Sequence, residues 1–420
     1  MIFSVGALAL LALQSVHAAP SLQKASSRGV KASEHTLALK PVSVKPGSSR
    51  ELLSRVAKAK NTTHSASLNV VDEGGAYAIE ANLGGKNFDV IFDTGSSDLW
   101  VFKSGVKCVT GTGHPAAASQ CGFGPEFKGN FQGGSIKNET FYIAYADGEQ
   151  LIGTLGYEDV TIAGVKVKKQ EMALVDEAYW EGDGTASGIV GFASKYLTNA
   201  FPGTMPSNNT QPLHYNNFIT NAVNSKAIDP VFGVVLERNN GSSSVTLGGV
   251  PAAFANAKYA TTKLQKIEIS PHLIEKTQYT YYTITPDGVV LNGESKSTSF
   301  AGIVDTGTTL LYLPEAMAEA VNAAFDPPSQ YIKAAGVYEN DCNAKPPTFG
   351  ITIGGTTFNL TSEDLLPTGA EAKDPMTGGC VVGVQPSGST YAILGDRFLV
   401  NTVAVFDIGA EEMKFAAHSY

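Results

Sequence analysis

The sequence has few of the residues that bind metal ions or nucleic acids. Its four cysteines and seven histidines show none of the short spacings that zinc sites use, so we expect no metal and no cofactor. Charged residues make up only 16% of the chain, and the net charge is −9. Because no basic run is long enough to follow a phosphate backbone, we expect no nucleic acid as a partner.

The sequence also shows no apolar segment that reads as a membrane anchor. The run at residues 5–13 is too short to span a bilayer, and the small residues around Val16 and Ala18 suit cleavage by a signal peptidase. We interpret residues 1–18 as a signal peptide, with a buried N-terminal helix as the alternative. The last residues, 415–420, form neither a hydrophobic tail nor a retention signal. These features predict a secreted (extracellular) protein or one of an acidic vacuole.

Glycine and proline are abundant instead. The 420 residues include 44 Gly and 20 Pro, and 43% are hydrophobic, which favours an all-β, turn-rich protein over a helical bundle. This length exceeds what one core usually spans, so we expect two lobes. Apolar and alternating segments around turns predict hairpins within residues 77–92 and 141–155. Helices are expected only at residues 216–224 and 314–325.

Charge divides the chain into a short basic arm and an acidic body. Residues 21–64 carry a net charge of +7, whereas the chain from residue 65 onward carries −16. Such an arm is either a solvated tail or a pro-segment that charge holds on the body until acid protonates the carboxylates. Composition alone favours the solvated tail.

The cysteines form an even set in a chain that its signal peptide directs to an oxidising compartment. Of the three possible pairings, Cys108–Cys121 with Cys342–Cys380 closes the shortest loops, and we expect it. Five Asn-X-Ser/Thr sequons are glycosylation candidates: Asn61, Asn138, Asn208, Asn240 and Asn359.

One segment of the chain occurs twice. Residues 91–100 align without gaps on residues 303–312, with five identical positions that include Asp-Thr-Gly. Each copy is followed, roughly 90 to 100 residues later, by two apolar residues and a glycine, at 189–191 and 393–395. The same order of motifs in both halves indicates two related lobes.

Each copy of the repeat places one aspartate at the end of an apolar strand. Asp93 and Asp305 are each followed by a tight turn in which Gly95 or Gly307 lets the backbone close up. If a pseudo-twofold axis relates the lobes, the two carboxylates face each other and share one proton. Such a pair can hold a water molecule, take its proton and donate another proton to a substrate oxygen.

The neighbours of the two aspartates support this chemistry. Thr94 and Thr306 supply hydroxyls that would lock the two loops to each other, and Ser96 and Thr308 would hydrogen-bond the outer carboxylate oxygens. A single Asp-Thr-Gly is more often a turn whose aspartate caps the backbone. Turn capping alone does not explain two copies at matching positions in the two halves of the chain.

These motifs resemble those of the pepsin-like aspartic proteases, and the secreted fungal members in particular. The likeness runs from about Ala76 to the C-terminus. It implies a bilobal pepsin-like fold, in which two related β-barrel-like lobes enclose an active-site cleft, and it makes Asp93 and Asp305 the catalytic dyad. By the same resemblance Tyr145 is the tyrosine of a flap that closes over the substrate and hydrogen-bonds Trp100.

The resemblance also implies the remaining site residues and the partners. Ile91, Trp180 and Ile189 would line the apolar side of the substrate cleft, and Gly307 and Thr308 would also contact substrate. Asp147, followed by Gly148, would let the pocket accept lysine, although a plain turn residue is equally compatible with the pattern. Polypeptide substrates, inhibition by the chain's own pro-segment, inhibition by pepstatin-type compounds and a monomeric state are expected.

On this basis the chain divides into four parts. Residues 1–18 are the signal peptide and 19–66 the basic pro-segment, whose end lies between 58 and 71. Residues 67–250 form the N-terminal lobe and 251–420 the C-terminal lobe. The resemblance thereby favours the pro-segment over a solvated tail.

Three other functions fit the sequence less well. A serine or cysteine hydrolase needs a nucleophile next to a histidine, but no Gly-x-Ser-x-Gly is present and the histidines are scattered. A glycosidase would not explain the repeated Thr and Gly neighbours of its two carboxylates. The serious alternative is a non-catalytic pepsin-like binding protein.

Substitution of either aspartate distinguishes the enzyme from the binding protein. We expect Asp93→Asn and Asp305→Ala to abolish cleavage of a denatured protein at acid pH, because each removes half of the proton-sharing pair. Peptide binding and peptide cleavage are measured on the same variants. Cleavage that survives both substitutions would contradict the dyad.

Overall fold

A computed structural model describes most of the chain, namely residues 30–42, 75–145, 148–182, 184–204, 211–238, 243–267, 279–297, 299–333, 335–367, 372–374, 376–388 and 391–418. Several sequence predictions fall outside these residues. They are the signal peptide, the proposed processing region at 58–71, Asp147, and the sequons at Asn61, Asn208 and Asn240.

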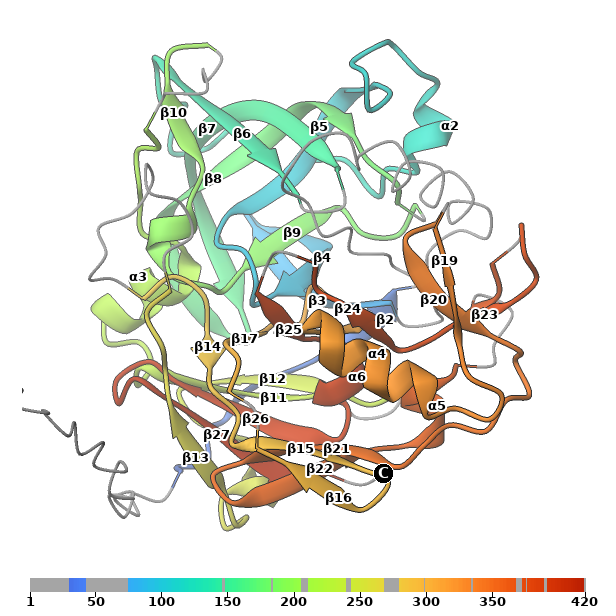
Figure 1. Cartoon of the computed structure of the whole chain (residues 1–420). Coiled ribbons are helices and arrows are strands. Elements are labelled where there is room, and N and C mark those ends of the chain that lie inside the picture. Colours follow the sequence, from blue (N-terminus) through green and yellow to red (C-terminus); the bar gives the residue numbers. More distant parts are fainter. Residues whose placement is uncertain are drawn as a thin grey trace, which may run out of the picture.

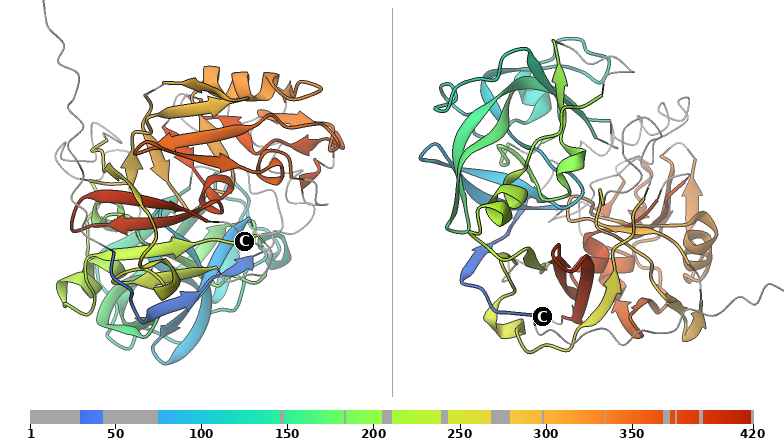
Figure 2. Two further views of the ribbon diagram at one scale, coloured as in Figure 1. Left: turned by 90° about the horizontal axis from the view of Figure 1, so that it is seen from below. Right: turned by 90° about the vertical axis from the view of Figure 1, so that its left-hand side faces the viewer.

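The chain forms a bilobal, all-β fold (Figures 1 and 2). The largest sheet belongs to the first lobe and has nine strands in the order β10-β6-β7-β8-β5-β9-β4-β3-β2. These strands are β2 (Lys40–Val42), β3 (Ala76–Leu83), β4 (Lys86–Asp93), β5 (Leu99–Cys108), β6 (Glu139–Ala144), β7 (Gln150–Ile162), β8 (Val165–Tyr179), β9 (Gly188–Gly191) and β10 (Ala200–Pro202).

The second lobe contains three smaller sheets, in the orders β14-β17-β25-β18-β24, β16-β15-β21-β22 and β19-β20-β23. Their strands are β14 (Thr283–Ile284), β15 (Gly288–Leu291), β16 (Glu294–Lys296), β17 (Gly302–Val304), β18 (Leu311–Leu313), β19 (Gln330–Ile332), β20 (Val337–Asn340), β21 (Phe349–Ile353), β22 (Thr356–Leu360), β23 (Cys380–Val381), β24 (Val384–Pro386) and β25 (Ala392–Leu394).

A six-stranded sheet joins the two halves of the chain, in the order β1-β12-β11-β26-β27-β13. It combines strands from both sides of residue 250, namely β1 (His35–Ala38), β11 (Val231–Val235), β12 (Ser244–Leu247), β13 (Ala260–Lys263), β26 (Thr402–Asp407) and β27 (Glu412–Ala417). The lobes therefore share a continuous sheet.

Helices are few and short, as the turn-rich composition predicts. They are α2 (Ala118–Cys121), α3 (Phe218–Asn224), α4 (Glu315–Ala323), α5 (Ser362–Leu365) and α6 (Asp396–Leu399), with 3-10 turns η1 (Lys195–Leu197) and η2 (Ala252–Phe254). The predicted helices correspond to α3 and α4. Among the described residues, no helix has the length and apolar character needed to cross a bilayer.

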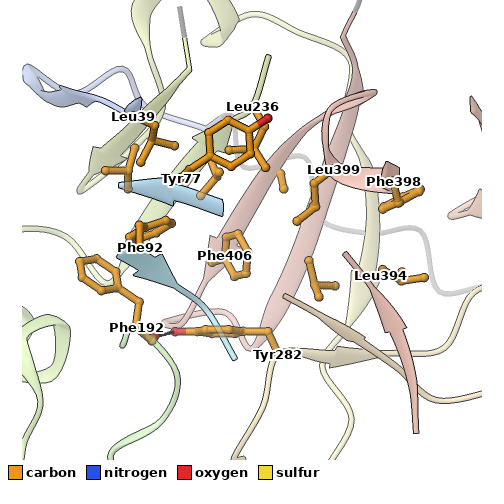
Figure 3. Close-up of a cluster of buried hydrophobic side chains, with 14 of the residues drawn as sticks. Leu39, Tyr77, Phe92, Phe192, Leu236, Tyr282, Leu394, Phe398, Leu399 and Phe406 are labelled. Atoms are coloured by element: carbon orange, nitrogen blue, oxygen red, sulfur yellow. Dashed lines mark hydrogen bonds between the residues drawn. The ribbon is translucent and has the colours of Figure 1, made fainter. Parts of the chain in front are cut away.

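Aromatic side chains from both halves pack together between the lobes (Figure 3). Phe232 stacks on Phe406 with ring centroids 4.4 Å apart, and Phe92 packs against Phe192 at 4.9 Å. Tyr282, from the second half, donates a hydrogen bond to the carbonyl of Phe192 at 2.7 Å. Because Phe92 directly precedes Asp93, this core lies under the first acidic loop and holds it in place.

Part of the basic arm is a structural component of the body. Strand β1 pairs with β12 and strand β2 pairs with β3, and Leu39 between them is buried in the main core, with only 3% of its surface exposed. Burial of a leucine contributes roughly 2 kcal/mol. The ion pairs Lys40–Asp89 and Lys31–Asp229 are largely exposed, and such pairs contribute less than about 1 kcal/mol each. Within the described residues, strand pairing and burial hold the arm more than charge does.

Two disulfide bonds are present, Cys108–Cys121 and Cys342–Cys380, which is the nearest-neighbour pairing. The first closes the loop that contains α2, and the second links the end of β20 to β23. The first bond spans only 13 residues, whereas the second spans 38 residues that include β21, β22 and α5.

A buried pair of acids lies beside the second disulfide. Glu339 in β20 is 3% exposed and Asp374 is 1% exposed. One oxygen of each is satisfied, because the Thr377 hydroxyl donates to Glu339 and the Met376 amide donates to Asp374. The other oxygens, Oε1 of Glu339 and Oδ2 of Asp374, have no hydrogen-bond partner among the described residues. Burial, followed by the contact with Asp374, raises the pKa of Glu339 to about 7, so one proton shared by the pair satisfies both orphan oxygens.

This acid pair makes stability depend on pH. The pKa of Glu339 is raised on folding from 4.5 to about 7, so its contribution to the free energy of unfolding is complete below pH 4.5 and is lost as the pH rises through 7. Glu339→Gln supplies an amide donor to Asp374 at every pH. We expect the Tm of the wild type, relative to this variant, to fall between pH 4.5 and pH 7 in thermal unfolding experiments. Glu294→Gln, at an exposed carboxylate, is the control, and identical pH slopes for the wild type and Glu339→Gln would contradict the assignment.

Candidate active site

The two halves of the sequence repeat form equivalent structures. Asp93 ends strand β4, which runs parallel to β9 so that Asp93 lies opposite Gly191. Asp305 follows β17, which runs parallel to β25. The apolar-apolar-glycine motifs of the repeat are therefore the strands beside the two aspartates. A side chain at Gly191 would lie 2.3 Å from the amide nitrogen of Ser97, which explains why glycine is required there.

The two acidic loops are locked to each other by their threonines. The amide of Thr94 donates to the Thr306 hydroxyl at 3.1 Å, and the amide of Thr306 donates to the Thr94 hydroxyl at 3.0 Å. Each hydroxyl in turn donates across the interface, Thr94 to the carbonyl of Val304 and Thr306 to the carbonyl of Phe92. Both threonines are fully buried. These four bonds fix the spacing of the loops.

Each aspartate is held by its own loop in the same way. The Gly95 amide and the Ser96 hydroxyl donate to the two carboxylate oxygens of Asp93. The Gly307 amide and the Thr308 hydroxyl donate to those of Asp305, at 2.8 and 2.7 Å. The two carboxylates therefore have matched partners and fixed orientations.

The two carboxyl groups lie against each other across the loops. A Cβ atom placed on Gly95 would lie 2.5 Å from the carboxyl atoms of Asp305, and one placed on Gly307 would lie 2.5 Å from Oδ1 of Asp93. Burial, followed by the negative charge of Asp305, raises the pKa of Asp93, which the Ser96 and Gly95 hydrogen bonds only partly offset. Two buried carboxylates in contact cannot both ionise at low cost, so the pair retains one proton.

The β6–β7 hairpin brings a tyrosine next to this pair. Tyr145 follows β6, and its hydroxyl accepts a hydrogen bond from the indole nitrogen of Trp100 at 2.8 Å. Burial, together with the negative charge of Asp93, raises the pKa of Tyr145 well above its ordinary value. Gly148 has a φ of 100°, which suits the tight hairpin turn.

The predicted apolar residues gather beside the hairpin. Ile91, Trp180 and Ile189 belong to one cluster with Trp100 and Tyr145. Trp180 meets Trp100 edge to face, with centroids 5.4 Å apart, and Ile91 pairs with Ile189 in adjacent strands. The cluster gives the dyad an apolar neighbour on the side of the first lobe.

The structure places two further residues near the dyad that the sequence analysis did not select. Burial, followed by the charges of Asp305 and Asp93, raises the pKa of Tyr281 to about 12. Asp396 is 4% exposed, and neither of its carboxylate oxygens has a hydrogen-bond partner among the described residues. Burial and then Asp305 raise the pKa of Asp396 well above its ordinary value. Asp396 could have been selected from the sequence, because it directly follows the repeated motif at 393–395. Tyr281 could not, because it lies in a run of tyrosines that has no counterpart in the first half.

Within the described part of the chain, no cluster of three or more His, Cys, Asp or Glu side chains is arranged to hold a metal ion. The groups that the site offers for chemistry are the carboxyl pair, its hydroxyl and amide partners, and the adjoining tyrosine.

Comparison with known proteins finds a matching family model, similar sequences and a similar solved structure. A family model described as eukaryotic aspartyl protease matches residues 76–418. A "probable aspartic-type endopeptidase" of Aspergillus fumigatus is 39% identical over 84% of this chain and 81% of its own length. Rhizopuspepsin-4 of Rhizopus niveus is 30% identical, with the same shares covered. The crystal structure of an aspartic proteinase from Irpex lacteus shares the fold, with a TM-score of 0.60 at 19% identity over 82% of this chain and 95% of that one.

A single added methyl group at the loop contact tests the geometry of the pair. Gly307→Ala would place a Cβ 2.5 Å from Oδ1 of Asp93, and a displacement of about 1 Å costs about 100-fold in rate. We expect kcat on a peptide substrate to fall by at least that factor. Gly302→Ala is the matched control, since Gly302 lies on β17, ahead of the acidic loop, and its Cβ would meet nothing closer than 3.4 Å. Equal activity of the two variants would show that the loops are not in contact.

Proposed function

The chain belongs to the eukaryotic aspartyl protease family and is an aspartic endopeptidase, and we propose that it is a secreted zymogen that cuts internal peptide bonds at acid pH. The observation that carries this proposal is the pair of buried carboxyl groups held in contact by reciprocal threonine bonds. A pair that retains one proton is both an acid and a base at low pH.

The mechanism follows from the shared proton. A water molecule held between Asp93 and Asp305 loses a proton to the ionised carboxylate and adds to the carbonyl carbon of the substrate. The protonated carboxyl gives its proton to the carbonyl oxygen, so a neutral tetrahedral diol forms. The carboxyl group that took the water proton then donates a proton to the amide nitrogen, while the other carboxylate takes one from a diol hydroxyl. The C–N bond breaks, an acid and an amine are released, and the pair again holds one proton. No covalent bond to the enzyme forms.

The residues around the dyad support a preference for apolar side chains. The cluster of Ile91, Trp180 and Ile189 lies next to Trp100 and Tyr145, and an apolar wall favours aromatic or aliphatic residues beside the cut bond. An extended substrate would lie in the inter-lobe cleft under the β6–β7 hairpin. Acceptance of lysine through Asp147 stays a prediction, because that residue lies outside the described residues.

The basic arm supports production as a zymogen. Its residues 30–42 contribute two strands and one buried leucine to the body, which gives the arm a defined docked position. The ion pairs Lys40–Asp89 and Lys31–Asp229 add exposed charge contacts at the same position. We propose that cleavage between residues 58 and 71 releases the active form, a monomer inhibited by pepstatin-type compounds.

Two surface sequons support secretion. Asn138 and Asn359 are both exposed, so glycans at either position would extend into solvent. The signal peptide remains a prediction from the sequence.

A pH–rate profile on denatured protein substrate tests the proposed function. We expect a bell-shaped profile centred well below neutrality, because activity needs one of the two carboxyl groups protonated and the other ionised. The unprocessed chain is expected to be inactive at neutral pH, and a pepstatin-type inhibitor is expected to abolish the acid activity. Maximal activity at neutral pH, or full activity with the inhibitor present, would refute the proposal.

A further inference from the structure

A hydrogen bond outside the dyad connects the turn of the β6–β7 hairpin to a neighbouring loop. Oε1 of Glu149 accepts from the backbone amide of Glu181 at 2.8 Å. Within the hairpin, the Tyr145 amide donates to the Glu149 carbonyl at 2.8 Å, and the Gly148 amide donates to the Tyr145 carbonyl at 3.1 Å. Glu149 is thus joined to Tyr145 through the backbone and to Glu181 through its side chain.

The loop that contains Glu181 has its own supports. It follows β8, and the amides of Gly182 and Gly184 donate to the carbonyls of Cys121 and Gly122 at 2.9 and 2.8 Å. Cys121 is in turn bonded to Cys108 on β5. The Tyr179 hydroxyl also donates to the Glu181 side chain at 2.7 Å. The loop is therefore braced by the disulfide and by β8, independently of the hairpin.

The same loop reaches Tyr145 by a second route. Trp180 packs edge to face on Trp100 at 5.4 Å, and Trp100 donates its indole hydrogen to the Tyr145 hydroxyl. Both the backbone and the hydroxyl of Tyr145 are therefore held by contacts that lead to the loop of Trp180 and Glu181. The backbone is held through Glu149, and the hydroxyl is held through the two tryptophans.

We infer that Glu149 is a positioning residue that fixes the Tyr145 hydroxyl next to the dyad through its bond to the Glu181 amide. The inference rests on the proposed function, in which Tyr145 covers the substrate. Glu149 acts here as a hydrogen-bond acceptor and not as a charge. A glutamine retains an acceptor oxygen at the same place, whereas an alanine does not. This difference separates the inference from a direct attraction between Glu149 and a basic substrate side chain.

Steady-state kinetics on a peptide without basic residues form the first test. Removal of the acceptor oxygen leaves the Glu181 amide without this bond, and only part of the loss reaches Tyr145, so we expect Glu149→Ala to raise KM about 3- to 10-fold with a smaller change in kcat. Glu149→Gln is expected to remain near the wild type. Glu126→Ala is the matched control, because Glu126 also accepts from a backbone amide, that of Gly105 at 3.0 Å, away from the hairpin.

Tryptophan fluorescence forms the second test and needs no catalysis. Trp100 and Trp180 are the two tryptophans of the chain, so intrinsic emission reports on this cluster alone. Glu149→Ala is expected to shift the emission to the red and to increase quenching by acrylamide, since the loop that carries Trp180 loses a bond. Glu149→Gln and Glu126→Ala are expected to match the wild type.

The two readouts distinguish the possible failures. An unchanged KM and unchanged emission in Glu149→Ala would overturn the inference, as would a Glu149→Gln variant as impaired as Glu149→Ala. If the Glu149→Ala variant does not fold, Tyr179→Phe takes its place, because it removes another hydrogen bond to the Glu181 loop. We expect it to shift the tryptophan emission in the same direction. No shift in Tyr179→Phe would count against the inference. A wild type without acid peptidase activity but with the expected emission changes would refute the proposed function and leave the Glu149 contact standing.

Discussion

The reciprocal hydrogen bonds between Thr94 and Thr306 are the constraint on which the rest of the structure depends. Two buried carboxyl groups repel each other once both are ionised, so nothing in their own chemistry would bring them together. The threonine bonds supply neutral, directional contacts that set the spacing whatever the protonation of the pair. Glycines at the contact then allow each carboxyl to reach the opposite loop. The pair retains one proton because the two carboxyl groups lie close enough to share it.

The architecture around the loops explains why these bonds hold. Phe92 and Val304 precede the two aspartates and are both fully buried, and the six-stranded sheet joins the halves of the chain. Movement of one loop against the other would disturb the aromatic core between the lobes (Figure 3). The protein thus uses a large apolar interface to stabilise a small polar one. The site gains rigidity where the chemistry requires a fixed distance.

The sequence was most informative where function constrains short motifs. The repeated Asp-Thr-Gly segments predicted the fold class, and they also predicted that the two loops would meet. Their neighbours Thr94 and Thr306 could be assigned a role because few other side chains can bridge two backbone turns. The helices near residues 216 and 314 were likewise visible from their pattern and from a proline at the start of the second.

Other features depend on contacts between distant residues, which spacing along the chain does not show. Tyr281 approaches the dyad because of how β14 pairs with β17. The Glu339–Asp374 pair arises from the packing of a loop against β20. The arm was expected to be held by charge, but pairing of β1 and burial of Leu39 are the stronger contacts. A count of charges gives no signal for either contact. Glu149 was overlooked because its partner is a backbone amide, which every residue possesses.

The position of β1 has a consequence for how the chain is made. Ser33, just before β1, hydrogen-bonds the carbonyl of Leu247, 214 residues further along, and β11 finds its partner β26 only near the C-terminus. Strand β1 must therefore wait until the 214 residues that separate Ser33 from Leu247 have followed before its partner strand exists. The central sheet cannot close until the last strands have been synthesised. Topology of this kind slows folding and lengthens the time for which strand edges stay open.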